Sequence, residues 1–322
     1  MSIIVFAENR TGKLKKTSFE AVSYAVNIAK NTSKSVVAVS VGNVTDEELS
    51  LLAKYGANKI VSVVDPKWEN HESQAYTKLL SEIAEKESAD VVVFSHSNLG
   101  KALAPRLSVR MKAGLISGVI ALPTEYLPIA VKRKTYNGGA FQLMKVKSSK
   151  AILTINPNSC EIAENPVDVN IENYTPAVSA EGGTKVESVD LITGKVLLTE
   201  AAIVISGGRG LKSGDNWGPI EELADILGAG IACSRPVSDE GWRSHDEHVG
   251  QTGKIIAPDL YLAVGISGAI QHIGGVSGTK VLVAIDKDKD APIFKYADYG
   301  INGDAFEVLP RLIESFKKFK AS

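Results

Sequence analysis

The 322-residue chain is poor in cysteine, in aromatic residues and in net charge. Its two cysteines, Cys160 and Cys233, form no Cys-x-x-Cys pair, so the sequence indicates neither a disulfide framework nor a zinc site. Lysine and arginine total 36 and aspartate and glutamate total 37, for a formal charge of −1. A partner such as nucleic acid or an anionic membrane calls for a clustered basic excess, so neither is expected.

Long apolar runs are also lacking. The short apolar segment at residues 3–6 precedes a basic cluster, which is the reverse of a secretory signal, and it is too short to span a bilayer. We therefore expect no membrane insertion and a cytoplasmic location. The composition, 44% hydrophobic and 23% charged, is that of an ordinary globular protein. The length favours two domains over one compact core.

The first half of the chain alternates apolar runs with amphipathic segments. The pattern predicts strands at 3–6, 36–41, 59–64 and 91–94, and helices at 18–30, 46–54, 73–86 and 99–111. Strands this apolar, separated by helices, indicate a parallel sheet covered on both faces. The rhythm then changes, because Asn137-Gly138-Gly139 between residues 129–134 and 141–147 is typical of a β-hairpin. Residues 151–155 and 167–171 add strand-like pieces, so this half is α/β with an antiparallel extension.

Two polar stretches of the first half bear on its organisation. The turn 95–101 follows a strand and opens a helix; it is suited to an anion, but a capped helix start is the favoured interpretation. Residues 175–187 are small, polar and glycine-rich, as expected of a linker. We therefore predict an N-terminal α/β domain at residues 1–186 and a second domain at residues 187–322.

In the second half, three apolar runs of strand character empty into polar turns, two of them rich in glycine. Residues 202–205 lead into Ser206-Gly207-Gly208-Arg209-Gly210, 261–264 into Gly265–His272, and 280–285 into Asp286-Lys287-Asp288. A strand that passes to a helix through glycines leaves bare N–H groups where the helix dipole favours an anion. Two such turns side by side are suited to a pyrophosphate, so a dinucleotide cofactor is the leading hypothesis.

Single residues in this half carry weaker signals. Ser213 stands where the last glycine of Gly-x-Gly-x-x-Gly would fall, so the turn alone is a weak indication of phosphate binding. Arg209 strengthens this interpretation, because its guanidinium can bind a phosphate. Ser234 and Arg235 follow a short strand, either at a ligand-binding sheet edge or as ordinary surface residues. His272 is equally consistent with a structural and a functional role.

The segment before the second glycine turn is polar. His245 and His248 are spaced for one helical face and a metal, but a solvated loop is the favoured interpretation. Residues 250–254 lack the spacing of a nucleoside-triphosphate loop. Cys233 is expected to be a small buried side chain and not a redox group.

The combination of these motifs resembles the electron transfer flavoprotein alpha subunits. The motifs are Ser206–Gly210, Ser234-Arg235, Val249–Lys254, Gly265–His272 and Ala297–Gly300, in this order. The resemblance implies a Rossmann-like second domain that binds FAD, and a heterodimer whose beta subunit contacts the first domain and holds AMP. It further implies an electron carrier, not an enzyme, that serves acyl-CoA dehydrogenases in fatty acid oxidation and a membrane electron transfer flavoprotein–quinone oxidoreductase.

The resemblance also assigns roles to residues. Arg235, Thr252 and His272 would tune the flavin, with Arg235 against the ring, Thr252 at N5 and His272 at the C2 carbonyl. Cofactor contacts would come from Arg209, Ser234, Arg235, Val249, Gly250, Gln251, Thr252, Ser267, Gly268, Ala269, Ile270, Gln271, His272, Asp286, Asp304 and Ala305.

Two positions depart from the family pattern. Asp286 replaces a common asparagine and can accept from a ribose hydroxyl but cannot donate to a phosphate. Ala305 replaces a larger apolar residue. Three other functions stay open: electron bifurcation from NADH, an NAD-dependent oxidoreductase, and a nucleotide-binding regulatory module in the first half.

Overall fold

The computed structural model describes residues 1–69, 72–184, 186–189 and 196–321. The chain divides into two compact units, Met1–Asp190 (unit 1) and Leu191–Ser322 (unit 2). This division falls shortly after the predicted boundary at 186/187. Among the described residues, no helix combines the length and the apolarity needed to cross a bilayer.

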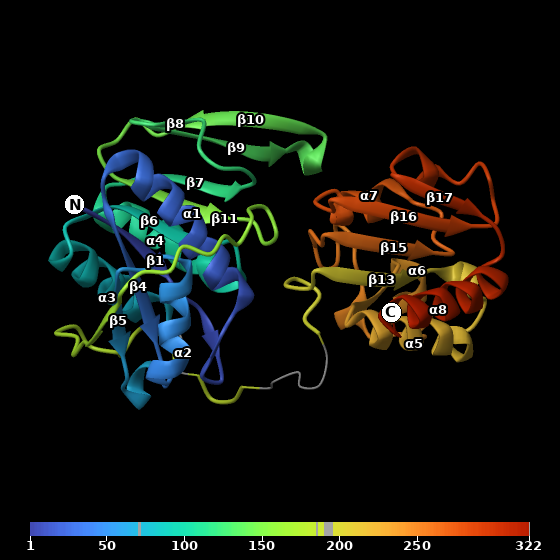
Figure 1. Cartoon of the computed structure of the whole chain (residues 1–322), viewed down its shortest axis with the longest axis horizontal. Coiled ribbons are helices and arrows are strands. Elements are labelled where there is room, and N and C mark those ends of the chain that lie inside the picture. The colour runs from blue at the N-terminus through green and yellow to red at the C-terminus, as the bar shows by residue number, and fades with distance from the viewer. Residues whose placement is uncertain (70–71, 185, 190–195, 322) are drawn as a thin grey trace. The chain divides into compact units, whose positions relative to one another are not determined.

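Unit 1 is built on one large sheet in the order β10-β9-β7-β11-β6-β1-β4-β5-β12, with β8 paired to β9. The parallel strands are β1 (Ser2–Phe6), β4 (Ser35–Val41), β5 (Lys59–Val63), β6 (Ala89–Ser95), β7 (Gly114–Val119), β11 (Ala151–Ile155) and β12 (Asn170–Asn173). The antiparallel strands are β8 (Glu125–Tyr126), β9 (Ile129–Thr135) and β10 (Ala140–Lys145). The predicted α/β fold with an antiparallel hairpin extension is confirmed (Figure 1).

The helices of unit 1 lie on both faces of this sheet. They are α1 (Lys16–Thr32), α2 (Asp46–Ser50), α3 (Ser73–Lys86) and α4 (Asn98–Met111), with a small hairpin of β2 (Asn9–Arg10) and β3 (Lys13–Leu14) before α1. One core joins α1 to one face of the sheet and a second core joins α3 and α4 to the other. Thr45 caps α2 as predicted, because its side chain accepts from the Glu48 N–H. Strand β7 was not predicted, since Gly114, Ser117 and Gly118 interrupt its apolar pattern.

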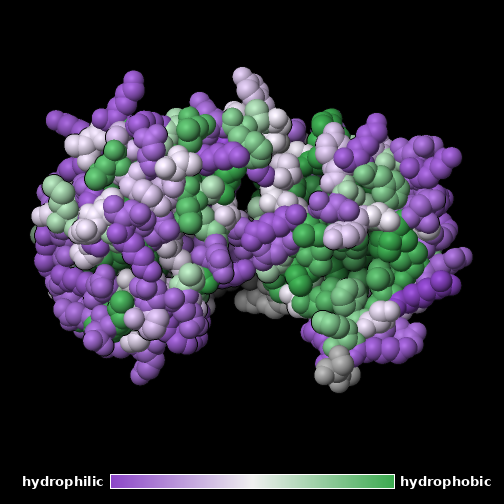
Figure 2. Space-filling view, turned by 45° about the horizontal axis from the view of Figure 1, so that its top comes forward, coloured by the Kyte–Doolittle hydropathy of each residue, from purple (hydrophilic) through white to green (hydrophobic). Residues whose placement is uncertain are grey.

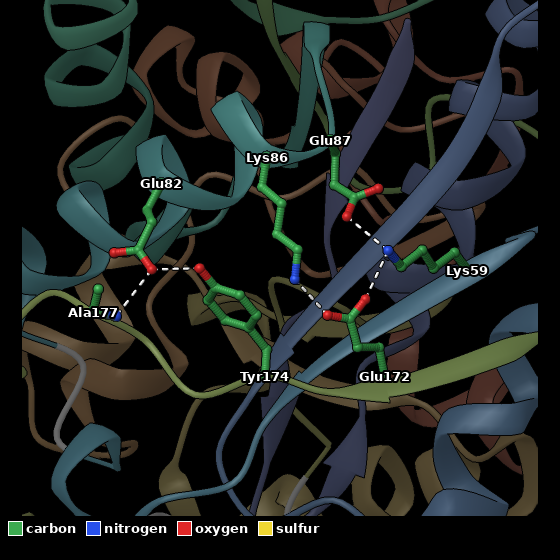
Figure 3. Close-up of polar contacts among 7 residues, drawn as sticks. All are labelled: Lys59, Glu82, Lys86, Glu87, Glu172, Tyr174 and Ala177. Atoms are coloured by element: carbon green, nitrogen blue, oxygen red, sulfur yellow. Dashed lines mark hydrogen bonds and ion pairs between the residues drawn. The ribbon is translucent and has the colours of Figure 1, made fainter.

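A polar strap, residues 172–178, begins in the last part of β12 and is held to unit 1 by charged side chains (Figure 3). Lys59 pairs with both Glu87 and Glu172 at 2.7 Å, and Lys86 pairs with Glu172 at 2.5 Å. The chain therefore stays fixed to β5 and α3 as it leaves the sheet.

Glu82 on α3 holds the next part of the strap (Figure 3). Its carboxylate accepts hydrogen bonds from the Tyr174 hydroxyl, the Ala177 N–H at 3.0 Å and the Val178 N–H at 3.1 Å. The predicted linker at 175–187 is thus wrong for its first residues, which contact unit 1; its residue 185 lies outside the described residues. A low apolar content did not distinguish a linker from a strap that is held by the carboxylate of Glu82.

Unit 2 contains one parallel sheet in the order β14-β13-β15-β16-β17. Its strands are β13 (Ile203–Gly207), β14 (Gly230–Cys233), β15 (Leu260–Val264), β16 (Val281–Asp286) and β17 (Tyr299–Asn302), and its helices are α5 (Gly218–Leu227), α6 (Arg235–Asp239), α7 (Ile270–Val276) and α8 (Ala305–Ala321). Helices α5 and α8 pack on one face of this sheet, and α7 with the loop at Val249 and Ile256 packs on the other. Figure 2 shows hydrophobic side chains gathered on the side of unit 2 turned to the viewer.

The strap gives a first testable expectation. We expect Glu82→Ala to speed amide exchange at Ala177 and Val178, because it removes one acceptor from three donors; a loss of about 1–3 kcal/mol corresponds to roughly 5- to 150-fold. Burial raises the pKa of Glu82, but the hydrogen bonds from Ala177, Tyr174 and Val178 outweigh it and hold this pKa below the ordinary 4.5. The protection is therefore present above that pH and disappears as the pH falls through the lowered pKa.

Hydrogen exchange followed by mass spectrometry measures this effect in the peptide that covers residues 174–184. The matched control is Glu85→Ala, an exposed glutamate on the same helix. Equal exchange in the two variants would contradict the role of Glu82.

Candidate functional site

The carboxyl edge of the unit 2 sheet collects most of the predicted site residues. All its strand pairs are parallel, so the segments that follow the strands emerge at one edge (Figure 1). The residues that follow there are Arg209 after β13, Ser234 and Arg235 after β14, Ser267–His272 after β15, and Asp286 at the end of β16.

The two glycine turns meet between β13 and β15, where the chain order of the sheet reverses. The Gly208 N–H donates to the Val264 carbonyl at 2.8 Å, and the Gly210 N–H donates to the Gly265 carbonyl at 3.0 Å. A Cβ on Gly208 would lie 2.1 Å from the Gly265 oxygen, and Gly265 itself has φ +62°. Only glycine allows this backbone contact, so the two turns lie directly against each other at the point where open α/β sheets bind ligands.

The second turn continues into α7 with a change from exposed to buried side chains. Ser267, Ala269, Ile270 and Gln271 are exposed, whereas Gly268 and His272 are buried. The Ser267 carbonyl accepts from the Ile293 N–H at 2.9 Å, which ties the turn to the following segment. The turn therefore offers its polar groups to solvent and sends His272 inward.

His272 is enclosed and neutral. Its Nε2 lies 2.7 Å from the Tyr261 hydroxyl, and its Nδ1 has no hydrogen-bond partner among the described residues. Burial lowers the pKa of His272 to about 4, against a smaller opposing effect of the Val249 backbone. At neutral pH the ring is therefore uncharged and can act as a hydrogen-bond donor or acceptor, but not as a cation.

The loop that carries Thr252 lies against the start of α7. Buried Val249 donates its N–H to the Cys233 carbonyl at 3.0 Å, and the Gln251 N–H donates to the Gln271 carbonyl at 2.8 Å. A Cβ on Gly250 would lie 3.8 Å from the His272 Cα. The structure thus brings Val249–Gln251 together with His272, while Thr252 is exposed.

His248 supports this loop, a role that the sequence did not reveal. Its ring is buried, and a Cβ on Gly253 would lie 2.8 Å from the His248 Nδ1. The loop therefore folds over the imidazole. A metal role is not supported, because the His245 Nδ1 pairs with the Ser238 hydroxyl at 2.7 Å and the described residues contain no group of three or more potential ligands. The glycines around His248 were the available sequence signal.

Arg243 anchors the same loop from outside. Its guanidinium pairs with Glu247 at 2.6 Å and Glu221 at 2.7 Å and lies 4.9 Å from the Trp217 ring centroid. A polar hollow of about 560 Å³ adjoins this group, but its lining includes no residue of the glycine turns. We therefore regard Arg243 as structural.

The two predicted arginines are exposed and held by neighbouring carboxylates. Arg235 Nε lies 3.3 Å from Asp239 Oδ2, and Arg209 lies 3.9 Å from Glu240. Burial first, and then the charge of Arg235, lower the pKa of His248. Arg235 therefore lies within electrostatic reach of His248, which in turn lowers the pKa of His272.

Ser234 is buried between two strand ends. Its N–H donates to the Gly207 carbonyl at 3.1 Å, which joins the end of β14 to the end of β13. Cys233, next to it, is fully buried, and burial raises the pKa of its thiol to about 12. The thiol is thus protonated and unreactive at neutral pH, consistent with a packing role.

The last predicted residues form a separate group at β16 and β17. The Asp286 carboxylate accepts from the Asp288 N–H at 2.9 Å, and the Asp304 carboxylate accepts from the Phe306 N–H at 2.9 Å at the start of α8. The Asp286 carbonyl accepts from the Gly303 N–H at 3.1 Å, so the two segments adjoin. Ala305, the first residue of α8, is buried in the core.

The corresponding turn of unit 1 is already filled by the protein. The Ser97 hydroxyl accepts from the Gly100 N–H at 2.9 Å and donates to the buried carboxylate of Glu8, which also pairs with Lys15 at 3.2 Å. A carboxylate at this helix start would repel an incoming anion. The favoured interpretation of residues 95–101 as a capped helix start is confirmed.

Family models match both parts of the chain. Residues 3–192 match the model described as the electron transfer flavoprotein domain, and residues 197–277 match the model described as the electron transfer flavoprotein FAD-binding domain. The second range contains the glycine turns and the Val249–Thr252 loop.

Curated relatives are similar over nearly the whole chain. Electron transfer flavoprotein subunit alpha of Bacillus subtilis (strain 168) is 37% identical over 325 residues, which cover 98% of this chain and 97% of that protein. The protein of the same name from Thermoanaerobacterium thermosaccharolyticum is 36% identical over 324 residues, covering 99% and 98%. Protein FixB of Clostridium saccharobutylicum is 30% identical over 321 residues, covering 98% and 96%.

The contact between the glycine turns is testable. We expect Gly208→Ala to destabilise unit 2 by about 1–3 kcal/mol, because its Cβ would meet the Gly265 backbone and force the turns apart. Urea unfolding followed by the fluorescence of Trp217 and Trp242 measures the change. Gly218→Ala is the control, since no heavy atom lies within 4 Å of the added Cβ. Similar destabilisation by both variants would contradict a specific contact at Gly208.

Proposed function

The chain belongs to the family of electron transfer flavoprotein alpha subunits, and from this premise we propose that it holds FAD at the carboxyl edge of the unit 2 sheet. The proposal rests chiefly on one observation, the backbone contact between the Gly208–Gly210 turn and Gly265 at the reversal of strand order. In this function the protein is an electron carrier between other proteins.

The residues present fit a dinucleotide. The two glycine turns pack backbone to backbone, and the second leads through exposed Ser267 into the start of α7, a position suited to a pyrophosphate. The buried Nδ1 of His272, which lacks a partner among the described residues, suits a polar atom of a ring held beside it. The Val249–Gln251 loop, packed against the same helix, supplies a wall for that ring.

We assign the binding roles as follows. Arg209 and the turn Ser267–Gln271 hold the phosphates, Ser234 hydrogen-bonds the cofactor, and the adenosine end lies towards Asp286, Asp304 and Ala305. Arg209 is exposed and only loosely paired with Glu240, so its guanidinium is available to a phosphate. The buried Ala305 contributes little contact area on the adenosine side.

Redox tuning is assigned to Arg235, Thr252 and His272. FAD, when bound, supplies the capacity to take up and release electrons one at a time. Arg235 provides a positive charge that does not depend on pH, which favours electron uptake by the nearby ring. His272 is neutral at pH 7, so it contributes a hydrogen bond rather than a charge. Thr252, exposed on its loop, offers its hydroxyl to the ring edge.

The proposed partners follow from family membership. We propose a heterodimer with an electron transfer flavoprotein beta subunit that contacts unit 1 and holds AMP. The electron donors would be acyl-CoA dehydrogenases and related flavin dehydrogenases, and the acceptor a membrane electron transfer flavoprotein–quinone oxidoreductase. Reduction of the flavin by NADH would instead favour a bifurcating carrier, and a purified heterodimer with no flavin absorbance would overturn the carrier proposal.

The role of Arg235 predicts a redox phenotype. We expect Arg235→Ala to retain FAD but to lower its first reduction potential by about 0.1–0.2 V, because a unit charge near 4 Å contributes roughly 4 kcal/mol at an effective dielectric of about 20. Solvent screening reduces the expected shift of the potential, since the Arg235 side chain is 62% exposed. A spectroelectrochemical titration measures the shift. Arg311→Ala, an exposed arginine on α8, is the control; an unshifted potential in Arg235→Ala would refute the assignment.

The departure at Asp286 predicts an effect on affinity. We expect Asp286→Asn to tighten FAD binding by about 3- to 10-fold, because it removes a negative charge beside the dinucleotide while the amide oxygen can still accept from the Asp288 N–H. Fluorescence titration of the flavin-free protein with FAD measures the dissociation constant. Weaker binding in the variant would show that the carboxylate accepts from a ribose hydroxyl.

A further inference from the structure

The buried contact between His272 and Tyr261 bears on which tautomer the neutral His272 ring adopts. One ring nitrogen carries a proton and the other a lone pair, and the surroundings select between the two forms. His272 is 7% exposed and Tyr261 is fully buried, so protein groups and not solvent select the tautomer of His272. The His272 Nε2 lies 2.7 Å from the Tyr261 hydroxyl, and within the described residues Nδ1 makes no hydrogen bond of standard geometry. The Val249 backbone lies close enough to act on the ring as an acceptor and raises the pKa of His272 slightly.

The direction of that hydrogen bond follows from acid strength. A phenol, with an ordinary pKa near 10, is a stronger acid than a neutral imidazole N–H, and a neutral imidazole nitrogen is the stronger base. The favourable arrangement is therefore Tyr261 O–H donating to Nε2. Burial raises the pKa of Tyr261 further, so the hydroxyl keeps its proton and remains a donor.

Ser206 completes the arrangement from the neighbouring strand. Its hydroxyl is buried and has no partner that meets hydrogen-bonding geometry within the described residues. It nevertheless lies near enough to Tyr261 to lower the pKa of the phenol, against the larger effect of burial. Because Tyr261 donates to Nε2, its oxygen is free to accept from Ser206, so both hydroxyls point their protons towards the imidazole.

We propose that Tyr261 is a positioning residue that holds His272 in the tautomer with its proton on Nδ1. This inference rests on the proposed FAD site, where His272 hydrogen-bonds the cofactor. With the proton on Nδ1, the nitrogen that lacks a protein partner is a donor and can bind a carbonyl oxygen of the ring. With the opposite tautomer, Nδ1 would present a lone pair to that oxygen and repel it.

Tyr261→Phe tests the proposal directly, since it removes the hydroxyl and keeps the aromatic ring. In the full-length chain labelled with ¹⁵N-histidine, long-range ¹H–¹⁵N spectra report which nitrogen of His272 carries the proton, and His272→Asn identifies the signals by their loss. We expect the Nδ1–H form in the parent chain and a shift towards the Nε2–H form in Tyr261→Phe. An Nε2–H form in the parent chain, or the same tautomer in both proteins, would overturn the proposal.

Cofactor binding gives a second readout. We expect Tyr261→Phe to weaken FAD binding about 10-fold, a loss equal to one net hydrogen bond, and Ser206→Ala to weaken it less. Tyr24→Phe is the matched control: Tyr24 is also fully buried, and its hydroxyl bonds the Ala121 carbonyl at 3.2 Å in unit 1. Equal loss in the control would assign the effect to stability and overturn the positioning role.

The two readouts separate this inference from the proposed function. If the parent chain binds no FAD, the proposed function fails, yet the tautomer is still measured in the same chain. If FAD binds and the tautomer does not respond to Tyr261→Phe, only the positioning role fails. Should Tyr261→Phe fold poorly, Ser206→Ala provides the tautomer test, with a smaller shift in the same direction expected.

Discussion

The close approach of two backbone turns is the constraint on which unit 2 depends. Gly208 and Gly210 lie against Gly265 so closely that a single methyl group would separate them. This contact fixes the ends of β13 and β15 at the reversal of strand order, through hydrogen bonds from the Gly208 and Gly210 amides. The loops that follow β14 and β15 then take their places around the carboxyl edge of the sheet, tied by hydrogen bonds to Gly207, Cys233 and Gln271.

Buried histidines organise the region beneath those loops. His248 is the ring over which Gly250 and Gly253 fold, and His272 is the ring that meets Tyr261. Both lose basicity through burial, so neither brings a charge to the site at neutral pH. The positive charge comes from arginines at the surface, where carboxylates hold them only at exposed ion pairs of small energetic weight. The buried histidines thus support the loops of unit 2, while the exposed arginines carry the positive charge.

Both units contain parallel strands, but they differ in what occupies the turn after a strand end. In unit 1, the Ser97 hydroxyl caps the helix start that a phosphate would need, and it donates to the carboxylate of Glu8, which also pairs with Lys15. In unit 2, glycines keep the corresponding edge free of side chains. A parallel sheet therefore offers a ligand position at its carboxyl edge, and a few residues decide whether the protein itself fills it.

Local sequence determined most strands, most helices, the hairpin and the glycine turns, because hydrophobic periodicity and glycine act over a few residues. It also predicted the segments that follow the strand ends at the carboxyl edge of the unit 2 sheet, from Arg209 to Asp286. Only the tertiary structure decided that Gly208 meets Gly265, that His272 pairs with Tyr261, and that residues 175–178 hold to Glu82. These contacts depend on strand order and on burial across distant parts of the chain. Helix α8 was also not predicted, although its amphipathic pattern is local, with Pro310 inside it. Its packing partners in the core under α5 are visible only in the tertiary structure.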